Sequence, residues 1–159
     1  MIAELIARFA ADADLLSRDI AGLTEAEFDA RPVAGQWTIR ELVWHVVDSD
    51  IILGDRLRRI IAEEKPSLIG FDETLFVQRL FYDQRDLGPA VKLFEVNRLV
   101  MVDILRRLQP TDFDRVGIHS EVGPLTLLQL LEKTVAHPLH HRKFLAEKRR
   151  LLGKPLFEN

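Results

Sequence analysis

Residues 126–152 read TLLQLLEKTVAHPLHHRKFLAEKRRLL, and this stretch carries the clearest fold signal in the chain. Thr126, followed by Gln129 three residues later, forms a capping box, which marks the first turn of an α-helix. Apolar side chains then recur with a helical period, and Gly153 ends the pattern. The stretch therefore predicts one long helix with a buried stripe.

Three further stretches show the same period. They cover about residues 2–21, 38–64 and 88–108. The second begins with another capping box, formed by Thr38 and Glu41. Four amphipathic helices of this length predict an all-α fold, a four-helix bundle that is either antiparallel or has a crossover connection.

The connecting segments carry weaker signals. Thr24 opens a short helical turn, and residues 75–82 favour a further short helix. We interpret residues 33–37 and 111–125 as loops. No strand-like alternation of useful length appears, so we expect no sheet.

Length and composition define the class of protein. A chain of 159 residues and 18.3 kDa fits one domain, residues 1–159. Hydrophobic residues make up 47% and charged residues 30%, a balance that excludes wholesale disorder. The chain has no cysteine, which excludes disulfides and thiolate-ligated metal sites. Any metal ion must therefore be held by His, Asp or Glu.

Charge and hydropathy limit the kinds of binding partner and the cellular location that the sequence predicts. A formal net charge of −3 gives no argument for nucleic-acid binding. No apolar run approaches the roughly 20 residues that a membrane-spanning helix needs. The first residues, Met1 to Leu5, include an acid and lack the basic start of a signal peptide. We therefore expect a cytoplasmic protein that binds neither nucleic acid nor membranes.

Two histidines in the C-terminal helix share one face. His137 and His141 are four residues apart, so their rings lie one turn apart on the same side. Leu130 and Thr134 belong to this stripe, so both histidines point into the bundle. The charged side chains expected on the far side are Glu132, Arg142, Lys143, Arg149 and Arg150.

A third histidine points inward from the second helix. His45 shares its face with Leu42 and Ile52. Three inward imidazoles from two helices would supply three neutral nitrogen ligands and leave positions open for water or substrate, the pattern of a catalytic site. We expect one divalent ion (Zn, Ni, Fe or Mn), among which the ligand set does not choose. The alternative is that the histidines pack without a metal, as hydrogen-bonded core residues.

Other polar residues on inward stripes are candidates for catalysis. Asp48 lies one turn after the inward histidine and could orient it or accept a proton; the alternative is a salt bridge with Arg56. Arg98 in the third helix is a candidate clamp for a substrate anion; the alternative is a buried partner for an acid such as Asp48 or Asp12. His140 could line the site or assist proton transfer.

Pro138 lies between the paired histidines, inside the predicted helix. A proline there removes the hydrogen bond to the Thr134 carbonyl, at a cost of about 3 kcal/mol, and predicts a kink. Tyr82 and His119 receive no role from the sequence.

Four stretches together resemble the DinB/YfiT-like superfamily of metal-binding four-helix bundles. They are Trp37–Asp48, Phe94–Arg98, Gly123–Leu131 and His137–His141. Their order and spacing match the layout of that family over nearly the whole chain.

The resemblance implies a divalent metal ion held by His45, His137 and His141. Relatives of this kind include S-transferases and a maleylpyruvate isomerase that use low-molecular-weight thiols such as glutathione, mycothiol or bacillithiol. Others are described as metal-dependent hydrolases, and dimers are common. Members often carry Asp directly after the first histidine of the paired motif, where this chain has Pro138.

We therefore expect a metal-dependent enzyme of the S-transferase or hydrolase kind, acting on a small molecule and in some cases with a small thiol. Asp48 or His140 would assist proton transfer, and Arg98 would hold an anionic group of the substrate. The alternative is a non-catalytic metal-binding or stress-response module.

We also expect a two-fold homodimer. The first and third helices carry apolar residues beyond a single stripe, namely Leu15, Leu23, Val100 and Val102.

Overall fold

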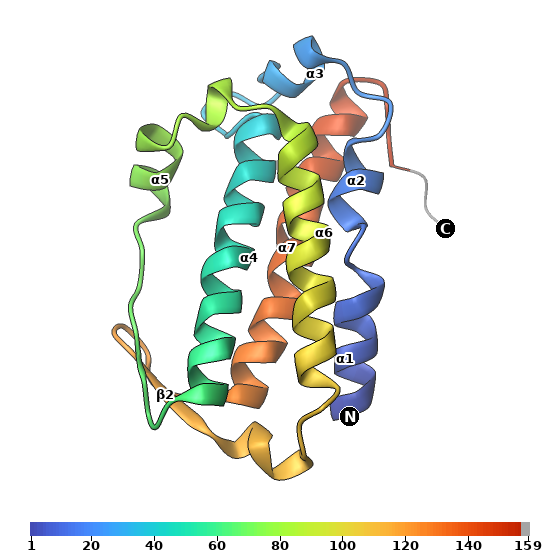
Figure 1. Cartoon of the computed structure of the whole chain (residues 1–159). Coiled ribbons are helices and arrows are strands. Elements are labelled where there is room, and N and C mark those ends of the chain that lie inside the picture. Colours follow the sequence, from blue (N-terminus) through green and yellow to red (C-terminus); the bar gives the residue numbers. More distant parts are fainter. Residues whose placement is uncertain (157–159) are drawn as a thin grey trace.

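Four long helical segments form the bundle in the computed structural model, which describes residues 1–156 (Figure 1). Each lies where the hydrophobic period predicts a helix, so the predicted all-α four-helix bundle is confirmed apart from one small sheet. The bundle elements are α1 (Ile2–Ala11) with α2 (Leu15–Ile20), α4 (Ile39–Ala62), α6 (Leu87–Leu105) and α7 (Leu127–Leu151).

The first predicted helix is interrupted. It is not continuous from 2 to 21 but consists of α1 and α2, with a turn around Ala13. In an unbroken helix Leu15 would lie about 120° away from Phe9 and would face away from the core. The break lets Leu15, Leu16 and Phe9 all become buried.

The connection between α4 and α6 is a crossover. In Figure 1 both helices run from the top of the view to the bottom, whereas α1 and α7 run upward. The chain must therefore return along the outside of the bundle between them. This return carries the predicted short helix as α5 (Glu73–Arg79) and a 3₁₀ turn, η1 (Tyr82–Gln84).

A small three-stranded sheet closes one end of the bundle, and the expectation of no sheet is wrong here. Strand β2 (Val116–His119) pairs with β1 (Ser67–Leu68) in parallel and with β3 (Gly123–Thr126) antiparallel. Strands of two to four residues are too short for an alternating pattern to be recognised. Pairing with β1, from the crossover, also depends on the tertiary fold.

The shorter connections are helical turns. The turn predicted at Thr24 is α3 (Glu25–Asp29), and Thr24 forms its capping box with Glu27. The segment expected as a loop after α6 begins with a second 3₁₀ turn, η2 (Pro110–Asp114), and continues into the sheet.

The buried core has two hydrophobic clusters separated by a polar layer. One cluster includes Leu42, Phe94 and Leu145, and the other includes Leu57 and Met101. Along α4, α6 and α7, buried and half-buried polar side chains lie between the two clusters. This polar layer comprises His45, Ser49, Asp50, Arg98, Thr134, His137 and His141.

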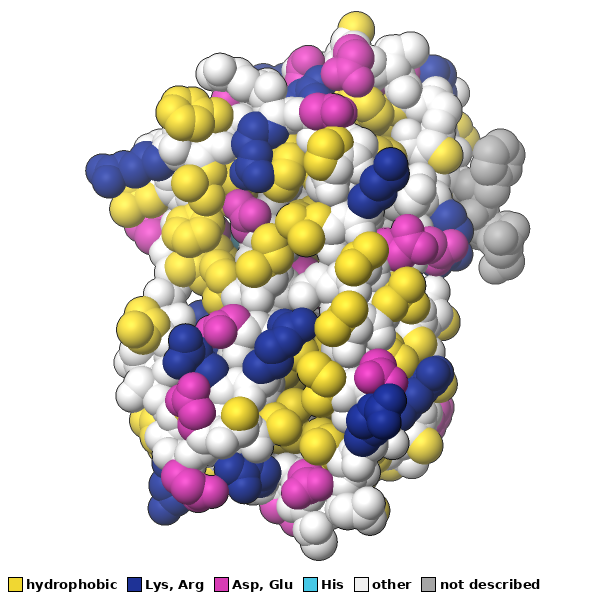
Figure 2. Space-filling model, in the orientation of Figure 1, with side chains coloured by type: hydrophobic (Ala, Val, Ile, Leu, Met, Phe, Trp, Pro, Cys, Tyr) yellow, Lys and Arg dark blue, Asp and Glu magenta, His cyan; other side chains and the backbone are white. Residues whose placement is uncertain are grey.

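Apolar side chains also reach the surface along α6. Figure 2 shows them along the face where α6 runs, interspersed with charged groups. Of the residues that suggested a dimer, Leu15 and Val102 are buried within their own chain, and Val100 is 49% exposed. The exposed apolar residues of α6 are Leu93, Val96, Leu99 and Val100.

Among residues 1–156, no helix combines the length and the apolar character needed to cross a membrane.

Candidate metal centre

Three histidines meet between α4 and α7. The Nε2 atom of His141 lies 3.1 Å from Nε2 of His45 and 3.2 Å from Nε2 of His137. One ligand nitrogen from each ring lies within 4.8 Å of the others. The structure thus brings together the three residues that the sequence singled out as metal ligands.

Local structure sets the position of each ring. His137 and His141 are one turn apart on α7, whose first turn is held by the capping box at Thr126. His45 lies in the second turn of α4, whose capping box at Thr38 is completed by Glu41. These caps begin both helices at defined residues, and therefore define the faces on which the histidines lie.

Hydrogen bonding alone does not account for this spacing. A neutral imidazole presents either one proton or one lone pair at Nε2. Nε2 of His141 therefore cannot form good hydrogen bonds with both His45 and His137 at once. Nitrogens bound to one ion at about 2.0–2.1 Å in a tetrahedral arrangement lie about 3.3 Å apart, close to the two distances found. The residues present therefore fit a divalent ion.

Burial keeps the three rings neutral. Loss of hydration is the main cause that lowers the pKa of His45 to about 4, of His141 to about 4 and of His137 to about 3. Repulsion from a neighbouring imidazole lowers these pKa values further: His141 acts on His45 and His137, and His140 acts on His141. At neutral pH all three offer lone pairs, the form in which histidine binds a metal.

One member of the triad, His141, lines a cavity of about 390 Å³. This volume is in the range of small-molecule sites. Aromatic rings form part of the wall: the ring of Trp37 lies 4.9 Å from that of His45, and Phe144 lies 6.3 Å from His141. The other lining residues are Gly35, Gln36, Leu42, Glu73, His140 and Lys148.

Glu73 is a site residue that the sequence did not indicate. Its Oε2 atom lies 3.6 Å from Nε2 of His45, beside the ligand atoms, and the side chain is 58% exposed. It comes from α5, on the crossover. No spacing in the sequence relates this crossover to α4, so only the tertiary fold could reveal the contact.

Arg98 does not face the cavity. Its side chain is fully buried, and Nη2 lies 2.9 Å from Oδ1 of Asp50. The guanidinium carbon lies 4.5 Å from the ring centre of Phe9 and 4.4 Å from that of Phe94. Arg98 therefore forms a buried ion pair, the alternative to a substrate clamp. Its partner is Asp50, not Asp48 or Asp12 as the sequence suggested. A substrate anion has no access to Arg98 in this structure.

Asp48 lies in a separate polar cluster. The hydroxyl of Tyr82 donates a hydrogen bond of 2.6 Å to it, and a guanidinium nitrogen of Arg85 lies 3.8 Å away. Burial and this carboxylate raise the pKa of Tyr82. The alternative of a salt bridge with Arg56 is not formed either; Arg56 donates to the carbonyl of Ile69. Among residues 1–156, Asp48 forms no hydrogen bond or ion pair with the triad.

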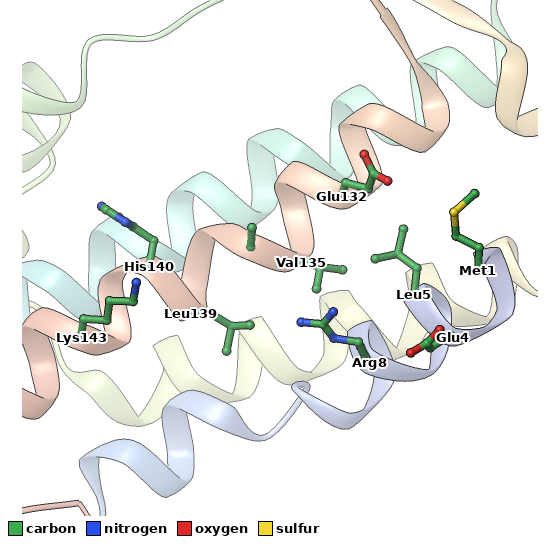
Figure 3. A pocket seen from close by; sticks show the side chains of 10 residues that line it. Met1, Glu4, Leu5, Arg8, Glu132, Val135, Leu139, His140 and Lys143 are labelled. Carbon is green, nitrogen blue, oxygen red and sulfur yellow. The ribbon is translucent and has the colours of Figure 1, made fainter.

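His140 lies at the edge of the site. Its ring centre is 5.1 Å from that of His141, the side chain is exposed, and it lines the cavity over the triad. It also lines an outer groove of about 550 Å³ between α1 and α7. Figure 3 shows it beside Lys143, among the α7 residues along this groove. His140 can therefore exchange protons with solvent.

His119 and Arg149 both lie away from the triad. His119 is buried on β2, outside the triad, and its Nδ1 accepts a hydrogen bond of 3.2 Å from the N–H of Glu121. Arg149 is buried rather than on the exposed side, because it donates to the carbonyls of Asp19 and Ala21 at the end of α2.

This bundle, with a three-histidine group between two of its helices, belongs to the DinB superfamily. The sequence profile of that family matches residues 2–145.

Similar proteins come from bacteria. A protein of Oceanobacillus iheyensis that bears the name "Putative metal-dependent hydrolase" is 28% identical over 127 residues, covering 80% of this chain and 73% of its own. YfiT of Bacillus subtilis, with the same name, is 25% identical over 139 residues, covering 87% and 78%.

Solved structures share the fold. That of Bacillus subtilis YfiT has a TM-score of 0.89 at 24% identity, covers 96% of this chain and 87% of its own, and is described as "a probable metal-dependent hydrolase with an unusual four-helix bundle topology". A DinB-like protein of the same organism, YjoA, has a TM-score of 0.64 at 17% identity, with coverage of 98% and 96%.

Proposed function

We propose that this protein is a metal-dependent hydrolase of small molecules, with one divalent ion held by His45, His137 and His141. One observation carries the proposal: three neutral imidazoles place their ligand nitrogens within 4.8 Å of one another, and one of these rings, His141, lines a cavity of small-molecule size. The names of the relatives in Oceanobacillus and Bacillus support it.

The ion would supply Lewis acidity and lower the pKa of a water molecule or thiol that reaches it. The remaining chemistry falls to side chains around the cavity. Glu73, 3.6 Å from His45, can accept a proton from the nucleophile. His140 reaches both the cavity and solvent, so it can carry that proton away. Trp37 and Phe144 supply apolar surface beside the triad.

The test starts from protein purified without a histidine tag and loaded with Zn²⁺, Ni²⁺, Mn²⁺ or Fe²⁺. Metal content is measured first, and hydrolysis of a panel of small esters and amides second. His137→Ala should lose both, whereas His119→Gln, a change at a buried histidine outside the triad, should keep both.

Two outcomes would redirect the proposal. Conversion of 1-chloro-2,4-dinitrobenzene that requires glutathione or another small thiol would identify a thiol-dependent S-transferase in place of a hydrolase. Stoichiometric metal with no turnover in either assay would favour the non-catalytic module.

A further inference from the structure

Lys148 is a buried cation in the wall of the cavity above the triad. It lies in the last turn of α7, and only 1% of the residue is exposed. Its Nζ atom donates a hydrogen bond of 2.9 Å to the amide oxygen of Gln36, which also lines the cavity. An ammonium group has three protons to donate. The amide accepts one of them, so donors remain for a further acceptor.

This environment differs from that of the buried arginines. Arg98 pairs with Asp50, and Arg40 pairs with Asp29 and Glu25. Within residues 1–156, no carboxylate oxygen lies within 4.0 Å of Nζ of Lys148. A buried cation is costly without an anionic partner. A ligand that brings a negative charge into the cavity would remove this cost.

The two ends of the cavity carry different charged groups. His141 and Lys148 are seven residues apart on one face of α7, which separates them by about 10 Å along the helix axis. Glu73 lies at the histidine end, 3.6 Å from His45. The divalent ion proposed at the triad and the ammonium group of Lys148 are both positive, so each end can attract an anionic group, and a variant of Lys148 distinguishes the two. Phe144 lies on α7 between the two ends, so the middle of the cavity suits an apolar group.

We propose that Lys148, together with the amide of Gln36, binds an anionic group of the substrate. The substrate class is then a small elongated carboxylate with an apolar middle, whose reacting bond lies at the triad. This inference rests on the proposed function for the reacting end. The anion site itself is tested by binding alone.

The test compares carboxylates with their uncharged amides. The probes are phenylacetate, 3-phenylpropanoate and 4-phenylbutanoate, each beside its primary amide, titrated into metal-loaded protein by calorimetry. For the length that fits, the carboxylate should bind about tenfold more tightly than the amide, the scale of a charge-assisted hydrogen bond. Lys148→Met should abolish this preference. Lys143→Met, which removes an exposed lysine of the same helix, should keep it.

The Lys148→Met variant also distinguishes binding of the carboxylate to Lys148 from its direct binding to the metal. Lys148→Met keeps all three histidines, so a preference that persists in this variant reports on the metal and overturns the proposal. Equal affinity for acid and amide at all three lengths in the wild type also overturns it. Lys148→Gln, which keeps a polar group beside Gln36, serves if the methionine variant does not fold.

A purely structural role for Lys148 predicts a different result. Lys148 would then only anchor residues 33–37 through Gln36, and Gln36→Leu and Lys148→Met would lower the melting temperature alike without any carboxylate preference in the wild type. Failure of the proposed function is distinguished from failure of the anion site, because metal content and turnover are measured without these carboxylate and amide probes.

Discussion

Arg98 on α6 donates a hydrogen bond of 3.1 Å to the main-chain carbonyl of Thr134 on α7. This carbonyl is the one that Pro138, four residues later, leaves without its helical donor. The guanidinium thus replaces the missing bond, and α7 continues through the proline to Leu151. Because His137 and His141 flank Pro138, the same contact ties the metal-binding turn to α6.

The Arg98–Asp50 pair should contribute strongly to stability and little to metal binding. Arg98→Met leaves the carboxylate of Asp50 buried without its cation, so the free energy of unfolding should fall by about 3–5 kcal/mol. Urea denaturation measures this loss. Metal content per folded chain should stay at the wild-type value, and the double variant Arg98→Met/Asp50→Leu should recover part of the stability. Lost metal with unchanged stability would contradict this role.

Arg98 and Pro138 should be energetically coupled through Thr134. In a Pro138→Ala background, the alanine N–H can donate to the Thr134 carbonyl in the helical manner. Arg98→Met should then cost about 1 kcal/mol less than in the wild type, because it no longer leaves that carbonyl without a donor. A double-mutant cycle by urea denaturation measures the coupling, and strictly additive changes would argue against it.

Metal binding should stabilise the folded chain through the triad. A ligand that binds only the folded state raises the melting temperature by mass action. Chelation should therefore lower the melting temperature of wild-type protein and of His119→Gln. His137→Ala should bind much less metal and respond little to the chelator. Calorimetry with metal analysis checks both, and a chelator response in His137→Ala equal to that of wild type would place the ion elsewhere.

The metal-free protein should lose stability as the pH falls from about 6.5 toward 4. Histidine in an unfolded chain has a pKa near 6.5, whereas burial lowers the pKa of His45 to about 4 and of His137 to about 3. Between these values the unfolded state binds more protons, so protonation favours unfolding. Melting temperatures of chelated protein from pH 7.5 to 4.5 test this. The decline should be shallower for His137→Leu, and an equal slope would exclude His137 as a contributor.

The exposed apolar face of α6 should mediate a homodimer. Leu93, Val96 and Val100 lie three and four residues apart on one side of the helix, and their exposure ranges from 43% to 56%. Val96→Lys places a charge at the centre of this face and should shift the protein to a monomer at micromolar concentration. Light scattering measures the mass. A wild-type monomer would refute the prediction.

The helices α4, α6 and α7 could be predicted from the sequence alone, from their hydrophobic period and their capping residues. Capping boxes at Thr38 and Thr126 and a helical apolar stripe depend on residues within a few positions of each other, so local sequence contains them. The same holds for His137 and His141, because spacing on one helix determines that they share a face. That His45 points inward also follows from the stripe around it.

Which side chains of different helices contact each other was decided only by the tertiary structure. The sequence left open whether Arg98 meets a substrate or an acid. The packing of α6 against α4 places Asp50 at Arg98. The sequence also gave no indication of Glu73 or Lys148. The crossover brings α5, and with it Glu73, to His45. Residues 33–37 fold back over the end of α7, where Gln36 meets Lys148. Burial and partners of a side chain depend on which helices become neighbours, and a crossover connection brings together residues whose separation along the chain follows no local period.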